Sequence, residues 1–138
     1  MFENYEKRNE DFYKVVTEMQ RKGSPGHRRA SVGYAIRKAL QSEAPSFYLS
    51  REHVWRQLHR RKRHMPPTEK PHRRAMWDEI ERALDQRLSE RKDEEPWVAL
   101  DYVLAHHRPS RFFISEAYAI KLVMRFEREQ KTTNEKKR

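Results

Sequence analysis

Two short segments of this chain have nearly the same order of residue types. Residues 44–50 are Ala-Pro-Ser-Phe-Tyr-Leu-Ser, and residues 109–115 are Pro-Ser-Arg-Phe-Phe-Ile-Ser. A run that favours a helix follows each final serine, and a serine hydroxyl there accepts a hydrogen bond from a free N–H of the first turn. The pattern therefore predicts two helices capped by Ser50 and Ser115, each entered through a connector of buried aromatic residues.

The similarity extends upstream of both connectors. Residues 35–46 match residues 99–110 at a shift of 64, and residues 8–19 match residues 73–84 at a shift of 65. The sequence thus predicts a tandem repeat of helix, helix, aromatic connector and capped helix. Its halves are 1–66 and 67–130, packed as one domain, with a disordered tail at 131–138. The alternative is that any two amphipathic helices produce such matches.

Composition favours an all-α fold with a thin core. Charged residues reach 38% and apolar residues only 36%, with three glycines in the whole chain. Apolar residues recur at helical spacing, and proline or glycine interrupts the pattern between segments. We expect about six helices, at about 4–21, 28–42, 51–64 and 72–92, then from 96 and from 116.

Several classes of protein are disfavoured by what the sequence lacks. Without cysteine there are neither disulfides nor cysteine zinc sites. There is no apolar run long enough to span a membrane, no signal peptide, no glycine-rich phosphate loop and no G-x-S-x-G motif. The sequence therefore predicts a cytoplasmic protein that is not an enzyme and has no catalytic residues, cofactor, metal site or membrane partner.

Positive charge is concentrated in the middle of the chain. Residues 27–74 contain thirteen basic and three acidic side chains, whereas residues 75–105 contain four basic and nine acidic ones. A concentrated positive field attracts polyanions, and the release of their counterions drives binding. The leading hypothesis is nucleic-acid binding, with double-stranded DNA favoured over RNA.

The candidate nucleic-acid-binding residues lie on four of the expected helices. Arginine and lysine contact phosphates, and arginine also recognises guanine in the major groove. The connector at 43–49 is longer than that of a standard helix-turn-helix, so we expect a variant in which the two capped helices contact two stretches of one duplex. The candidates are Arg28, Arg29, Arg56, Arg60, Arg61, Lys62, Arg63, Arg73, Arg74, Lys121, Arg125 and Arg128.

Two alternatives to nucleic-acid binding remain open. The carboxylates of Asp78, Glu79, Glu81 and Asp85 could neutralise the basic block within the chain, or they could pair with the basic block of a second copy to form a homodimer. An acidic protein partner would suit the same basic block. Magnesium binding by these carboxylates is the least favoured interpretation.

The second connector resembles a segment of a family of small bacterial proteins. That segment runs Pro-x-x-Arg-Phe-aromatic-Ile-Ser before a helix, often twice in one chain. Pro109 and the run from Arg111 to Ser115 resemble it, with one residue instead of two after the proline, and Ser46 replaces the arginine in the first copy. The resemblance covers two short segments and implies no activity, cofactor or partner.

Overall fold

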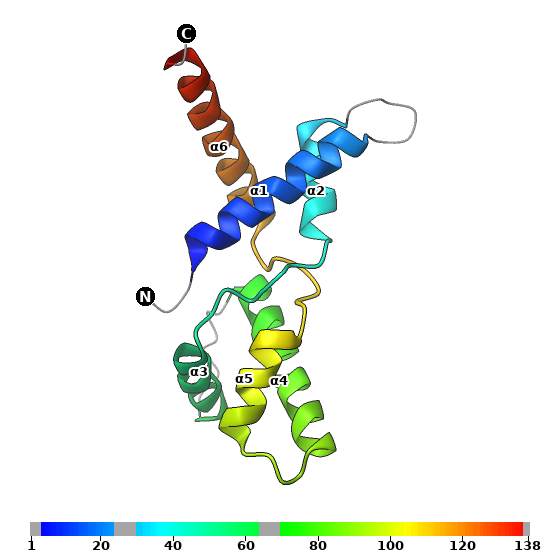
Figure 1. Ribbon diagram of the computed structural model, residues 1–138, viewed down its shortest axis with the longest axis vertical. Helices are drawn as coiled ribbons and strands as arrows, with labels where there is room; N and C mark the ends of the chain where they lie inside the picture. The colour runs from blue at the N-terminus through cyan, green and yellow to red at the C-terminus, as the bar shows by residue number, and fades with distance from the viewer. Residues whose placement is uncertain (1–3, 24–29, 64–69, 137–138) are drawn as a thin grey trace.

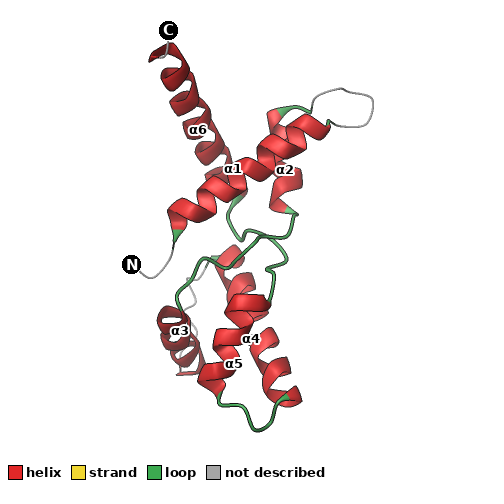
Figure 2. Ribbon diagram, in the orientation of Figure 1, coloured by secondary structure: helices red, strands yellow, loops and turns green. Residues whose placement is uncertain are grey.

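The computed structural model describes residues 4–23, 30–63 and 70–136 of the chain. Over these residues the chain forms six helices and no strand, as expected for the predicted all-α class (Figure 2). They are α1 (Tyr5–Lys22), α2 (Val32–Leu40), α3 (Arg51–Arg63), α4 (Pro71–Glu90), α5 (Pro96–His106) and α6 (Glu116–Lys136).

Local signals in the sequence set where the helices begin. The Ser50 hydroxyl accepts a hydrogen bond from the His53 amide at 3.2 Å, and the Ser115 hydroxyl accepts one from the Tyr118 amide at 3.1 Å. Both predicted serine caps are confirmed. Proline begins α4 and α5, where its fixed φ is compatible with the first turn of a helix and its missing N–H costs nothing.

The helices form two lobes. The upper lobe consists of α1, α2 and α6, and the lower lobe consists of α3, α4 and α5 (Figure 1). Each lobe therefore combines two helices from one predicted repeat with the last helix of the other. The sequence matches gave no indication of this exchange, because they show which segments are similar and not which ones touch.

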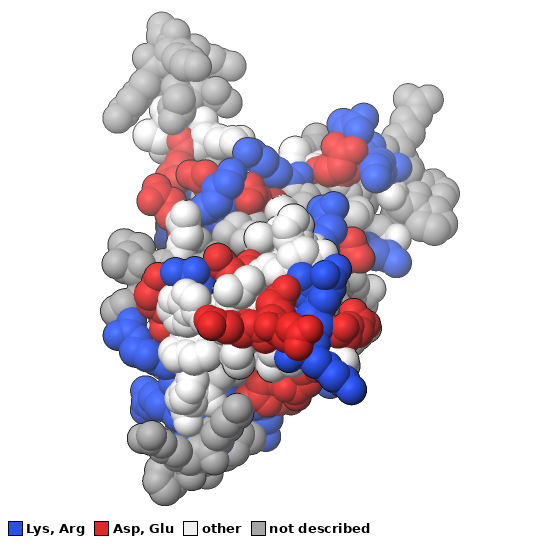
Figure 3. Space-filling view, turned by 60° about the horizontal axis from the view of Figure 1, so that its bottom comes forward, with Lys and Arg blue, Asp and Glu red and all other residues white. Residues whose placement is uncertain are grey.

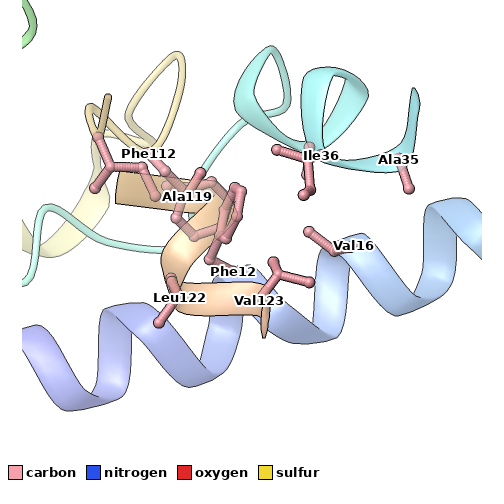
Figure 4. Close-up of a cluster of buried hydrophobic side chains, with 11 residues drawn as sticks. Phe12, Val16, Ala35, Ile36, Phe112, Ala119, Leu122 and Val123 are labelled. Atoms are coloured by element: carbon pink, nitrogen blue, oxygen red, sulfur yellow. The ribbon is translucent and has the colours of Figure 1, made fainter. Parts of the chain in front are cut away.

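The core of the upper lobe brings together residues from both ends of the chain (Figure 4). Phe12 of α1 is fully buried, and its ring meets that of Phe112 edge-on, with 5.2 Å between the centroids. Val16, Ile36 and Val123 pack in the same cluster. Burial of such side chains contributes roughly 1.5–3 kcal/mol each, so α6 is held to α1 and α2 by apolar packing.

The core of the lower lobe lies between α4 and α5 and is closed by α3. Trp77 and Ile80 of α4 are buried against Leu100 of α5, and Val54 of α3 is also fully buried. Phe47, from the first connector, belongs to this cluster and stacks on Phe113 with 6.4 Å between the ring centroids. The three phenylalanines of the two segments, Phe47, Phe112 and Phe113, are all buried, whereas Tyr48 is half-buried.

The two connectors cross between the lobes (Figure 1). They touch directly, because the Ala44 amide donates a hydrogen bond to the Pro109 carbonyl at 3.1 Å. Tyr48 and Phe113 both have left-handed backbone, with φ of 60° and 58°. This conformation costs a residue other than glycine about 1–3 kcal/mol and persists only where packing holds it. Each connector therefore contains a defined turn, at Tyr48 in the first and at Phe113 in the second.

The end of α6 differs from the prediction. The sequence predicted a disordered tail at 131–138, whereas α6 continues to Lys136, and residues 137–138 lie outside the described part of the chain. Glutamate, arginine, lysine and glutamine favour helix, and neither proline nor glycine follows to stop it. The prediction failed here because it required an apolar anchor for helix formation, which α6 already has in its first half.

Candidate nucleic-acid interface

Helix α3 separates its apolar and cationic side chains on two faces. Val54 and Leu58 are buried one turn apart, whereas Arg56 and Arg60 are exposed one turn apart on another face. This division follows from the helical period, which places residues four apart on the same side. Arg56 and Arg60 therefore lie where a polyanion in solvent can reach them.

Arg51, the first residue of α3, is held against α5. Its guanidinium donates a hydrogen bond to Asp101 at 3.0 Å, and its Cζ lies 4.0 Å from the centroid of the Trp97 ring. A guanidinium stacked on an indole gains a cation–π attraction. Arg51 thus joins α3 to α5 and is not part of the exposed cationic face.

Arg61 was predicted to bind nucleic acid, and the structure corrects this prediction. Its side chain is only 6% exposed, and its Nη2 donates to Asp78 Oδ1 at 2.7 Å. Its Nη1 lies 3.3 Å from Glu81 Oε1. The position follows from sequence spacing, since Arg61 is three residues after the buried Leu58 on the apolar face of α3. Two carboxylates of α4 therefore neutralise one cation of the basic block within the chain.

Replacement of Arg61 tests this ion pair. We expect Arg61→Ala to lower the free energy of unfolding by about 2 kcal/mol, because two neighbouring carboxylates lose their shared cation. The loss stays below that of a fully buried pair, since water reaches the half-exposed Asp78 and Glu81. Arg61→Met, which retains an apolar stem, should recover about half, and Arg60→Ala should stay within about 0.5 kcal/mol. Urea unfolding measures all three, and equal losses for the two alanine variants would contradict the assignment.

Helix α6 has a second exposed cationic face. Lys121, Arg125 and Arg128 are all exposed and line an open groove of about 480 Å³ along the helix. Ala119, Leu122 and Val123 point to the core from the opposite face. The three cations predicted on α6 are therefore exposed to solvent.

The cations of α3 and α6 occupy equivalent positions. Counted from the serine caps, Arg56 corresponds to Lys121 and Arg60 corresponds to Arg125, each 65 residues apart. The buried residues keep the same register, because Val54 corresponds to Ala119 and Leu58 to Val123. Arg63 and Arg128 continue the pattern in the sequence. Two helices thus present cations at the same places relative to the same kind of connector.

The remaining candidates divide into three groups. Arg28 and Arg29 lie outside the described residues, and so do the side chains of Lys62 and Arg63, whose backbone ends α3. Arg73 is half-buried and Arg74 is exposed in the first turns of α4. On the face drawn in Figure 3, Lys and Arg form several separate groups with Asp and Glu between them. On this face, cationic and anionic side chains are therefore interleaved.

A polar cluster around Arg8 was missed by the sequence analysis. The Arg8 Cζ lies 5.5 Å from the ring centroid of Tyr118, and the buried Asn9 donates from Nδ2 to the Tyr118 hydroxyl at 3.2 Å. Tyr48 donates its hydroxyl proton to Asp11 at 2.7 Å, and burial, together with this bond, raises the pKa of Tyr48. Only the fold brings these residues together, because they are 37 or more positions apart along the chain.

His72, at the start of α4, makes stability depend on pH. Burial lowers its pKa, and the nearby charges of Arg73, Lys70 and Arg8 lower it further. The unfolded chain therefore takes up a proton first, at a pKa of about 6.5, so stability is complete above that pH and falls as pH drops toward the lower folded pKa. The urea concentration at the unfolding midpoint should decrease as the pH falls from about 7.5 to about 5. We expect this decrease to be smaller in His72→Gln than in the unchanged chain. An equal decrease in the variant would contradict this role.

The chain was also compared with known proteins, and its surface was examined for other sites. Searches against protein families, curated proteins and solved structures return no match. Within 4–23, 30–63 and 70–136, no group of three or more histidine, aspartate and glutamate side chains is arranged to hold a metal ion. None of the described helices is both long and apolar enough to cross a membrane. The exposed cations of α3 and α6 are the candidate functional site.

Proposed function

We propose that this protein binds double-stranded DNA through the exposed faces of α3 and α6, without catalysing a reaction. The observation that carries the proposal is the equivalence of Arg56 and Arg60 on α3 with Lys121 and Arg125 on α6. Cations in the same register on two exposed helix faces can contact phosphates that repeat along a duplex.

The arrangement of the two helices favours a duplex over a single compact anion. α3 and α6 leave the crossing connectors in opposite directions (Figure 1). A linear polyanion would extend along both helices, whereas a compact anion would reach only one of them. Two helices contacting two stretches of one duplex would bind more tightly than either alone, because the second contact forms within the complex.

We also propose that the chain is a tandem repeat whose last helices are exchanged. The left-handed residues Tyr48 and Phe113 are 65 positions apart, as are the serine caps. The N-caps of α2 and α5 are 64 positions apart. The buried positions of α1 align with those of α4 better at a shift of 64 than at the shift of 65 found in the sequence. At a shift of 64, the buried Phe12, Val16 and Gln20 correspond to the buried Met76, Ile80 and Leu84.

A salt titration tests the proposed function. Binding of the whole chain to fluorescent duplex DNA, duplex RNA and single-stranded DNA is measured by anisotropy. We expect duplex DNA to bind most tightly, with a dissociation constant near micromolar or lower at about 150 mM salt and a log–log slope that corresponds to several neutralised phosphates. Absence of binding to all three ligands at that salt would refute the proposal.

Homodimerisation through the acidic α4 and the basic block is the less favoured alternative. Asp78 and Glu81 already meet Arg61 of the same chain, and Glu79 accepts a hydrogen bond from the Ser110 amide at 2.9 Å. Only Asp85 of the four carboxylates has no such contact among the described residues. Pairing between chains would have to break contacts within each chain, which opposes it.

A further inference from the structure

Helix α6 has large apolar side chains on its surface, next to its cations. Ile120 is 44% exposed and Met124 is 53% exposed, one turn apart. Together with Tyr118 they line the open groove that also includes Lys121 and Arg125. Phosphate contact alone gives no role to these apolar side chains, so the groove has a feature that the proposed function does not use.

The position on α3 that is equivalent to Ile120 is covered. Ile120 corresponds to Trp55, 65 residues earlier, and the Trp55 ring packs edge-on against the ring of Trp97, with 5.1 Å between the centroids. Both tryptophans are half-buried. In the lower lobe, therefore, a tryptophan near the start of α5 covers the apolar side chain at this place on α3.

The upper lobe lacks this cover. Since the N-caps Ser31 and Glu95 are 64 positions apart, the counterpart of Trp97 on α2 is Gly33. A Cβ built at Gly33 would meet only the tip of the flexible Arg37 side chain, at 3.8 Å. Position 33 therefore supplies no side chain in the place of Trp97, and Ile120 is left without the tryptophan that covers its equivalent, Trp55.

We propose that the groove on α6 binds an acidic segment of a partner protein through an aromatic side chain. The aromatic ring would pack on Ile120 and Met124 as Trp97 packs on Trp55, and the carboxylates would face Lys121 and Arg125. The chain contains a segment of this chemistry at 93–97, Asp-Glu-Glu-Pro-Trp, in its lower lobe. In the lower lobe, the packing of Trp97 on Trp55 is the model for the proposed contact between the partner's aromatic ring and α6. The cationic residues of α6 favour acidic neighbours for the ring by charge complementarity.

The partner site is inferred without reference to DNA binding, but the two ligands would share the cations Lys121 and Arg125. A partner that occupies the groove covers Lys121 and Arg125 and leaves Arg56 and Arg60 of α3 exposed. It would therefore weaken contact with a duplex at one end of the surface and retain it at the other. Partner binding would act as a competitor for half of the proposed DNA interface.

The test uses the whole chain with labelled methyl groups and a synthetic peptide of residues 92–98, Lys-Asp-Glu-Glu-Pro-Trp-Val. We expect saturable shifts of the Ile120 and Met124 methyl resonances as peptide is added. Gly33→Trp, which supplies the missing ring from within, should weaken peptide binding at least about tenfold. The matched Gly33→Ala variant should bind as the unchanged chain does, and a peptide with alanine for tryptophan should bind at least about tenfold more weakly.

Four outcomes would overturn the inference. These are no saturable shift up to about 1 mM peptide, equal shifts with the alanine peptide, binding unaffected by Gly33→Trp, and shifts that depend on protein concentration alone. The last would assign the groove to a second copy of the chain. Thermal unfolding confirms that Gly33→Trp is folded. Duplex DNA binding by the same variants is measured separately, so failure of the partner site leaves the proposed function standing, and the converse also holds.

Discussion

Reversing the charge of Arg60 and Arg125 together is expected to weaken duplex DNA binding about 100-fold or more at about 150 mM salt. Both side chains are exposed, at equivalent positions on α3 and α6. Each substitution to glutamate removes a phosphate contact and adds a repulsion. Because each lost contact lowers the salt slope by about 0.9, the slope of the double variant should decrease by about 2. Anisotropy titrations at several salt concentrations measure both quantities.

The control has the same change in net charge at another place. Arg91 and Lys92 are exposed after the end of α4, away from the cationic faces of α3 and α6. The double variant Arg91→Glu with Lys92→Glu should change binding less than about fivefold, through the long-range field alone. If both double variants lose affinity equally, DNA responds to net charge, and the assignment of the two helices is wrong.

Phe12→Ala is expected to lower the free energy of unfolding by about 3–5 kcal/mol. Phe12 is fully buried in the upper lobe, and removal of its ring leaves a cavity that α1, α2 and α6 share. Domains of this size are stable by about 5–15 kcal/mol, so the thermal midpoint should fall by about 10–20 °C. Met124→Ala, at an exposed position of α6, should stay within about 0.5 kcal/mol. Thermal and urea unfolding measure both.

A milder series tests the exchanged packing directly. Phe12 and Phe112 touch across the upper lobe, whereas Phe47 belongs to the cluster of the lower lobe. In a double-mutant cycle of leucine substitutions, Phe12 and Phe112 should couple by about 0.5–1.5 kcal/mol. Phe12 and Phe47 should be additive within about 0.5 kcal/mol. Coupling of the second pair and not the first would mean that the second connector does not pack on α1.

The local features of the fold could be predicted from the sequence because they depend on neighbouring residues. The serine caps, the buried Phe47 and Phe112, and the helical faces of α3 and α6 all follow from spacing within a few turns. Such signals depend on the helical period and on capping chemistry. The all-α fold followed from the same local patterns.

The exchange of α3 and α6 between the lobes could not be predicted in this way. The apolar stripe of each helix indicates which of its faces must be buried. It does not indicate which pair of helices covers that face. The partners of Arg61 were likewise hidden, since its neighbours in the sequence are all cationic and the carboxylates that bind it lie on α4. What decides such cases is tertiary packing, which no local pattern encodes.

The crossing connectors also affect how the protein forms during synthesis. Phe12 emerges from the ribosome a hundred positions before its ring partner Phe112. α3 similarly precedes α4 and α5, against which it packs. The upper lobe cannot close until α6 has been made, so apolar faces of α1 and α2 remain open to other molecules during translation. A truncated product that ends before α6 would retain that exposed surface and would be a target for chaperones and proteases.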